Sequence, residues 1–322
     1  MSEKDNTTTL GEQVALASGV EPTGSGRSQG DPAVPDPIRM AFQIRPLHLT
    51  ISIAAIALLV LMVNSLVSSE YLHWEVFFQF LFSPQVTQGI ELTIWLTVIS
   101  MVVGTLIGIV AAFAKMSNIW GVRLISNVYI WLFRGTPLMV QVILIFNLAL
   151  FVPNLSFGPW EVDTNRVMTP FFSAVLALTL NEGAYMAEYI RGAILGVDPG
   201  QREAALSQGM SSQRALRRII LPQAIPPLIP VFGNQTISML KATSIVSVIA
   251  ASELLTRVQI IYHQNYYVIE LLFVACAWYL VIVSLASLIQ HFIERGLAQR
   301  GFAREKPTSL RAKFMRNLRF DR

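Results

Sequence analysis

Long apolar runs separated by short polar segments follow one another along the chain from residue 47 onward. Six runs lie at 47–67, roughly 88–114, about 137–152, near 170–195, 224–250 and 267–292. About 20 apolar residues in a helix cross the hydrocarbon core of a bilayer, and a helix satisfies its own backbone hydrogen bonds there. The pattern therefore predicts an all-α membrane protein with about six transmembrane helices. The third run has an amphipathic lead-in, "RLISNVYIWLFR".

Polar tails flank these runs. Residues 1–46 are rich in Gly, Pro, Ser and Thr and cannot bury a core, so they are predicted to be disordered. The run at 47–67 is too long, and too far from the start, for an ordinary cleaved signal peptide, which indicates an uncleaved anchor. Residues 293–322 form a basic tail.

Composition supports a membrane protein. Of 322 residues, 53% are hydrophobic and 14% are charged, with a mean hydropathy of +0.52, whereas soluble domains carry about 25% charge. The lone Cys276 excludes an intrachain disulfide, and the four histidines lack metal-ligand spacing. The net charge of +4 is small. We expect neither a metal site nor a nucleic-acid partner.

The distribution of Lys and Arg predicts the orientation. If the spans alternate from a cytoplasmic N-terminus, the outer loops 68–87, 151–169 and 251–266 hold only Arg166 and Arg257. The remaining segments hold nearly all the other basic residues. Since cytoplasmic loops carry the excess of Lys and Arg, both termini and the loop at 198–222 are predicted to be cytoplasmic.

The loop at 198–222 is predicted to form two short helices. Asp198 is a suitable N-cap with Pro199 at the first helical position, and Gly209 is placed to end the helix, after about Gln208, in a left-handed conformation. The second helix, "SSQRALRRII", would turn Leu216, Ile219 and Ile220 inward and its arginines outward. Pro222 would end it before the next span. On these grounds alone the loop is either a connector on the membrane surface or a docking site.

A residue pattern in this loop resembles the EAA loop of ABC importer permeases. That pattern is EAA, three residues, G, nine residues and I-x-L-P. The matching residues are Glu203, Ala204, Ala205, Gly209, Ile219, Leu221 and Pro222. The stretches "FRGTPLMVQVILIF", "NEGAYMAEYIRGAILGVDPGQREAA" and "LKATSIVSVIAASEL" are similar to the polar amino-acid branch of that family, which includes histidine, glutamine and arginine permeases.

This resemblance implies a type I ABC importer transmembrane domain over 86–292, with a five-helix core preceded by one extra helix at 47–67. It also implies that this chain lies in the inner membrane of a bacterium, and that its cytoplasmic EAA loop docks on a separate ATPase dimer. The chain lacks the G-x-x-x-x-G-K-[ST] phosphate loop, so ATP and Mg are expected on the ATPase and no cofactor on this chain.

Other implied partners are a second permease chain, identical or paralogous, an extracytoplasmic solute-binding protein, an amino-acid substrate and membrane lipid. The chain is then a transport subunit and not an enzyme. Two other functional classes are alternatives for such a chain. A secondary transporter or channel would be favoured by inverted repeats, and none is visible. A membrane-embedded enzyme would need a catalytic constellation, and none is apparent.

Charged and small residues inside the runs raise further expectations. Glu182 and Lys241 lie deep in their runs, where ionisable groups are costly unless they pair or face a cavity. They either form a salt bridge or line a substrate path. Glu188 and Arg191 are spaced for a local ion pair. Gly104 and Gly108 have a spacing that allows close helix contact but also occurs without it.

Overall fold

The computed structural model describes residues 46–157 and 160–297. The chain divides into two units, Met1–Ser69 and Glu70–Arg322. In the first unit, α3 (Pro46–Val67) is the helix predicted at 47–67, and its apolar side chains, such as Leu61, are exposed. The predicted tails lie outside the described residues except for Pro46, which begins α3, and residues 293–297, which belong to the last helix.

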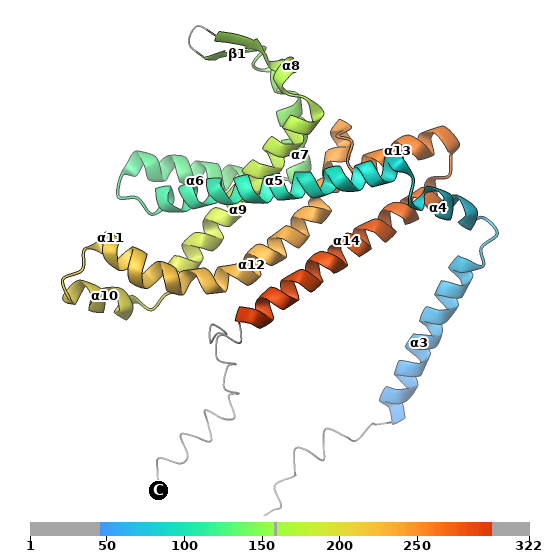
Figure 1. Cartoon of the computed structure of the whole chain (residues 1–322), viewed down its shortest axis with the longest axis horizontal. Coiled ribbons are helices and arrows are strands. Elements are labelled where there is room, and N and C mark those ends of the chain that lie inside the picture. Colours follow the sequence, from blue (N-terminus) through green and yellow to red (C-terminus); the bar gives the residue numbers. More distant parts are fainter. Residues whose placement is uncertain (1–45, 158–159, 298–322) are drawn as a thin grey trace, which may run out of the picture. The chain divides into compact units, whose positions relative to one another are not determined.

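The second unit is mostly helical (Figure 1). Its elements, in chain order, are α4 (Trp74–Leu81), α5 (Pro84–Lys115), α6 (Trp120–Gly135), α7 (Leu138–Phe146), η1 (Leu148–Leu150), β1 (Asn154–Phe157), β2 (Trp160–Asp163), α8 (Thr164–Val167), α9 (Pro170–Leu195), α10 (Pro199–Ser207), α11 (Ser212–Ala215), η2 (Leu216–Ile220), α12 (Leu221–Ala242), η3 (Thr243–Ile249), α13 (Leu254–Asn265) and α14 (Val268–Leu297). Helix α9 is central, because it contacts α5, α6, α7 and α12.

Local capping sets where the long helices begin. Ser83 accepts a hydrogen bond from the backbone N–H of Val86, and Pro84 follows as the first residue of α5. Thr169 and Pro170 begin α9 in the same way. A hydroxyl at the N-cap satisfies a free N–H, and a proline at the first position has no N–H to leave unpaired.

Helices α5 and α9 pack closely at two glycines. A Cβ atom on Gly104 would lie 3.0 Å from Cβ of Glu182, and one on Gly108 would lie 2.6 Å from Cβ of Met186. Only glycine allows these backbones to approach so closely. Of the two possibilities left open for this spacing, the close contact is the one observed.

A sharp break separates α6 from α7, whose axes differ by 108°. The break lies at Thr136 and Pro137. The carbonyl of Phe133, at the end of α6, accepts hydrogen bonds from the amides of Gln141 at 2.9 Å and Asn181 at 3.0 Å. These amides satisfy backbone that the break would otherwise leave unpaired in a water-poor environment.

The expectation that Pro222 ends the second loop helix was wrong. Helix continues from Ser212 to Ile249, through the π-helical turn η2 and into α12, in which Pro222 is near the first position. The N–H of Leu221 donates to the carbonyl of Leu216. This longer i to i+5 bond widens the turn, so a proline just after it costs no α-helical hydrogen bond there.

The predicted outer loops contain structure that was not expected. Residues 68–87 include α4, residues 151–169 include the antiparallel pair β1–β2, and residues 251–266 include α13. The buried carboxylate of Glu253 caps α13: it accepts from the backbone N–H of Thr256 at 2.8 Å and from the hydroxyl of Tyr279 at 2.8 Å. Tyr279 belongs to α14, so this carboxylate ties α13 to that helix.

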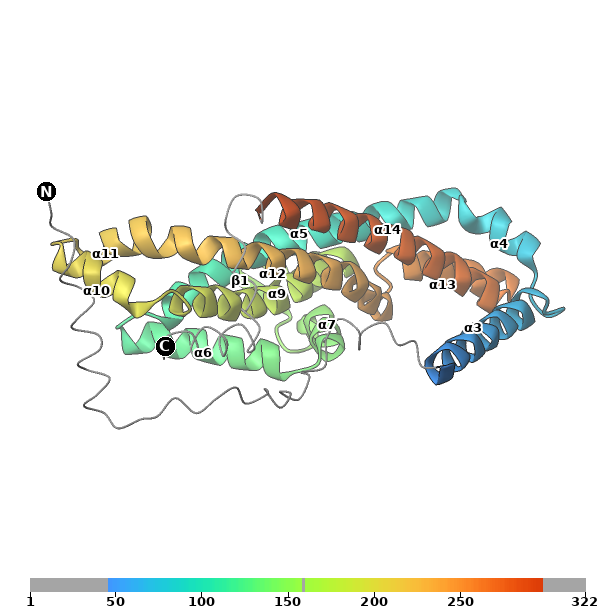
Figure 2. The same cartoon turned by 90° about the horizontal axis from the view of Figure 1, so that it is seen from below.

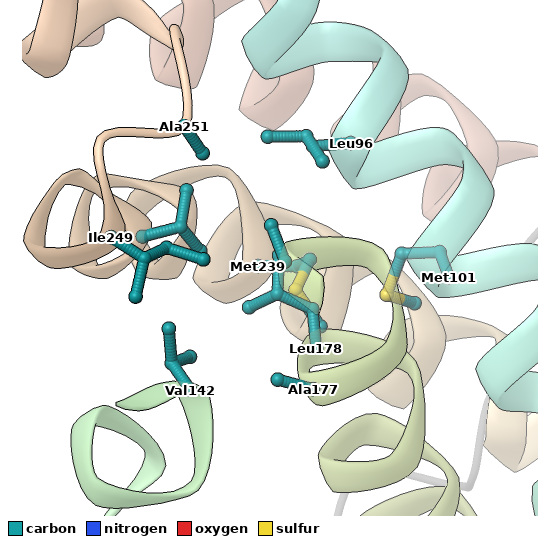
Figure 3. Packing of buried hydrophobic residues seen from close by; sticks show 10 residues of the cluster. Leu96, Met101, Val142, Ala177, Leu178, Met239, Ile249 and Ala251 are labelled. Atoms are coloured by element: carbon teal, nitrogen blue, oxygen red, sulfur yellow. The ribbon is translucent and has the colours of Figure 1, made fainter. Parts of the chain in front are cut away.

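Buried apolar residues form a core where α5, α7, α9 and α12 meet. Figure 3 shows Leu96, Val142, Leu178 and Met239 converging from these four helices. A second cluster joins α5, α6 and α9 to Ile220, the last residue of η2, and to Ala224 of α12. The loop at 198–222 is therefore attached to the helix bundle by packed side chains.

Among the described residues, α5 and α14 are long and apolar enough to cross a membrane, and four spans result if each bent pair, α6–α7 and Ser212–Ile249 with α13, counts as one. The apolar helix Thr50–Ser65 is shorter. Helix α9, predicted to span at 170–195, carries Glu182, Glu188 and Arg191, which lower its hydropathy. The number of spans thus stays a prediction.

Candidate functional site

The first loop helix, α10, ends as its sequence predicts. Asp198 accepts from the N–H of Gly200 at 2.8 Å and so caps the helix. At the other end, Gly209 has φ +79°, its N–H donates to the carbonyl of Leu206 at 2.9 Å, and the N–H of Met210 donates to Ala205 at 3.1 Å. These two bonds define a Schellman turn, in which glycine is strongly favoured.

The EAA residues do not share one environment. Glu203 and Ala204 are exposed, whereas Ala205 is buried, because α10 packs against α11 and η2. Of the two alanines, only Ala204 leaves a small side chain at the surface. Figure 2 shows α10 and α11 together at one end of the unit. The exposed face of α10 is therefore formed around Glu203 and Ala204.

The second loop helix turns its apolar side chains toward the bundle. Ile220 is buried, and Leu216, Ile219 and Leu221 are half-buried. Ile220 packs in the cluster that contains Ile190 and Ile194 of α9. A displacement of the loop would be transmitted to α9 and α12 through these contacts, since close-packed side chains are not freely compressible.

Glu182 lies buried in α9. It is 3% exposed, one of its oxygens accepts from the amide of Gln235 on α12 at 3.4 Å, and its other oxygen has no hydrogen-bond partner among the described residues. The hydroxyls of Ser100 and Thr179, also buried, likewise lack a partner there. Sequence reasoning missed Ser100, Thr179 and Gln235, because hydroxyl and amide residues are ordinary in such helices.

Among the described residues, no ion pair joins Lys241 to Glu182. Its side chain is exposed near the end of α12. Lys241 and Gln235 are six residues apart on the same helix. The structure therefore gives no support to a direct salt bridge between Glu182 and Lys241.

Glu188 forms the predicted ion pair with Arg191, at 2.8 Å, and a second one with Lys115 at the end of α5. Nearby, the guanidinium of Arg134 lies over the ring of Tyr185, 5.2 Å from its centroid. Sequence reasoning did not find the Lys115 contact, because it joins residues far apart in the chain. This cluster ties α5, α6 and α9 together on the side predicted to be cytoplasmic.

Within the described ranges, no group of three or more His, Cys, Asp or Glu side chains is placed to hold a metal ion.

Residues 104–299 match the family described as binding-protein-dependent transport system inner membrane component. The chain belongs to this family. The matched residues include α9, the whole loop at 198–222 and α12, so Glu182, Lys241 and the EAA residues of this inner membrane component all lie within the family domain. Helix α3 and the first part of α5 lie outside it.

The relatives of this inner membrane component are named as permeases. It is 35% identical over 274 residues to an arginine transport system permease of Corynebacterium glutamicum, covering 84% of this chain and 85% of the relative. It is 41% identical over 217 residues to an L-cystine transport system permease of Bacillus subtilis, covering 67% of this chain and 88% of the relative.

A solved amino acid ABC transporter has a similar chain. The similarity has a TM-score of 0.59 and 37% sequence identity, and it covers 66% of this chain and 94% of that one. This agreement confirms the predicted fold class, an α-helical ABC importer permease. The all-α prediction did not include the small β1–β2 pair. The relatives are transport subunits and not enzymes, as was expected for this chain.

Proposed function

We propose that this permease forms the translocation path for a polar amino acid in an ATP-driven importer, and that it couples to a separate ATPase through the EAA loop. The observation that carries this proposal is the arrangement of α10. This helix presents Glu203 and Ala204 to solvent and is followed by the turn at Gly209. It packs against a second helix that runs directly into α12. Relatives named for arginine, cystine and glutamine transport support an amino-acid substrate.

The proposed complex contains an ATPase dimer that binds ATP and Mg, a second permease chain and an extracytoplasmic solute-binding protein. ATP-driven closure would push on the exposed face of α10. The packed side chains around Ile220 would then carry the movement into α9 and α12.

Within the path, we assign Glu182 to the ammonium group of the substrate and Lys241 to its carboxylate. Glu182 suits this role because it is buried and one of its oxygens has no partner among the described residues. Lys241 suits it because its side chain is exposed and forms no ion pair with a described residue. An unpaired buried charge costs several kcal/mol, so a cationic group of the substrate would be stabilised there.

The complex with its ATPase, purified in lipid, tests the coupling. Loaded binding proteins should stimulate ATP hydrolysis in the parent complex. Gly209→Val should abolish the stimulation, since a β-branched residue does not tolerate φ +79°, and Glu203→Lys should weaken ATPase binding. Gly209→Asn and Glu203→Gln are the matched controls, because asparagine tolerates the left-handed conformation and glutamine keeps the shape. Normal stimulation in Gly209→Val and Glu203→Lys would make the loop a connector only.

A further inference from the structure

Three arginines gather at a recess on the second loop helix. The recess has a volume of about 280 Å³ and is lined by Ser211, Gln213, Arg214, Arg217 and Arg218. All five residues are exposed. None of the three arginines forms an ion pair with another described residue, so their charge is left for a partner of the opposite sign.

The chemistry of the recess suits a phosphate group. Guanidinium groups bind phosphate oxygens in a bidentate geometry, and serine and glutamine side chains supply further hydrogen-bond donors. Three cations placed together without a counter-charge repel one another, which an anion between them would relieve.

An apolar groove of about 390 Å³ borders the part of α12 that follows the recess in the chain. It runs between α5, α9 and α12 and is lined by apolar side chains apart from Thr105. Leu221, which lines the groove, follows Arg217 by four residues on one continuous helix, so the recess and the groove lie about one helical turn apart along that helix. Ile225 and Phe232, on later turns, also line it and are 53% and 38% exposed.

We propose that the recess and the groove together bind one anionic phospholipid of the cytoplasmic leaflet. The phosphodiester would contact the three arginines, and an acyl chain would lie along α12 from Leu221 toward Phe232. In the predicted orientation the arginines are at the cytoplasmic surface, where anionic lipids attract basic residues and basic pockets between helices bind their headgroups.

A second permease chain is a less suitable occupant of this groove. A two-fold axis along the membrane normal would bring the same three arginines of a second copy to the same depth. Like charges at an interface are unfavourable. A lipid phosphate instead complements the recess.

The test is binding of phosphatidylglycerol to the purified full-length chain, measured by native mass spectrometry, with phosphatidylcholine of the same oleoyl chains as reference. Phosphatidylglycerol should bind more tightly. The double variant Arg217→Gln, Arg218→Gln should bind it about thirty-fold more weakly, which corresponds to about 1 kcal/mol for each arginine. Ile225→Ser should weaken both lipids about five-fold, as expected from losing one or two buried methylene groups.

The control is the double variant Arg123→Gln, Arg202→Gln, which removes equal charge from the same predicted side but lines neither the recess nor the groove. It should bind phosphatidylglycerol within about two-fold of the parent, the size of a small screened surface effect. Unchanged phosphatidylcholine binding in Arg217→Gln, Arg218→Gln would show that the variant is folded.

Four results would overturn the lipid site: equal binding of the two lipids, parent-like binding by Arg217→Gln, Arg218→Gln, equal loss in the control, or full displacement of the lipid by inorganic phosphate. A fifth would come from cross-linking. In a Cys276→Ser background, an Ile225→Cys disulfide between two chains in phosphatidylglycerol membranes would show that a second copy covers the groove.

Discussion

Replacing Gly108 with alanine should separate α5 from α9 and destabilise the bundle. The added methyl carbon would lie 2.6 Å from Cβ of Met186 and 3.0 Å from the carbonyl oxygen of Gly183. Carbon atoms pack best about 3.5–4.0 Å apart, so the overlap is about 1 Å. Neither Cβ nor a carbonyl can rotate away, so the helices themselves must move. Overpacking of this kind costs about 1–3 kcal/mol.

A graded series on the same two helices makes the reasoning testable. Gly104→Ala would bring its methyl carbon to 3.0 Å from Cβ of Glu182, a smaller overlap, and a methyl group on Gly192 of α9 would meet no atom within 4 Å. The midpoint of thermal unfolding in detergent, followed by loss of the monodisperse gel-filtration peak, should fall most for Gly108→Ala. For 2 kcal/mol the expected fall is about 4–8 °C in a unit of this size.

Gly192→Ala should unfold at or slightly above the parent temperature, because alanine is the better helix former. Gly104→Ala should lie between the two. An unchanged midpoint for Gly108→Ala, or an equal fall for Gly192→Ala, would refute the assignment of close contact to Gly104 and Gly108.

Three further predictions concern topology, the substrate path and the α13 cap. In a Cys276→Ser background, single cysteines near Ser69, Asn154 and Gln264 should react with an impermeant reagent added outside, and one at Ser207 should not; outside labelling of Ser207 would reject the orientation. The double variant Glu182→Lys, Lys241→Glu should stay inactive in transport while still binding its ATPase, because no ion pair joins these residues in the described structure; recovery near the parent rate would reject the substrate assignment. Tyr279→Phe should lower the free energy of unfolding by about 1.5–3 kcal/mol, because its hydroxyl donates to the buried Glu253 carboxylate at 2.8 Å, whereas Tyr71→Phe, at a 92% exposed position, should not; equal midpoints for both would contradict it.

Local features of the sequence determined much of the candidate site. The start of α10 at Asp198 and Pro199 and its end at Gly209 follow from hydrogen bonds within a few residues of the chain. The same holds for the ion pair of Glu188 with Arg191, one turn apart. The apolar runs predicted the long helices because a helix that crosses a bilayer needs about 20 consecutive apolar residues, and the length of such a run can be read from the sequence.

Tertiary structure alone decided which distant residues meet. At the 108° break between α6 and α7, the carbonyl of Phe133 accepts a hydrogen bond from the Asn181 amide, which comes from α9. The contact between Lys115 and Glu188 also joins residues far apart in the chain. Glu182 and Lys241 are both charged residues inside apolar runs, yet only the tertiary structure shows that Glu182 is buried and Lys241 is exposed. The effect of Pro222 was predicted wrongly because a proline removes a hydrogen bond from a regular α-helix, whereas the widened turn at η2 lets the helix continue through it. Periodicity indicates which residues of one helix share a face, but not which face of another helix they contact. That contact positions Glu182 and forms the groove beside α12.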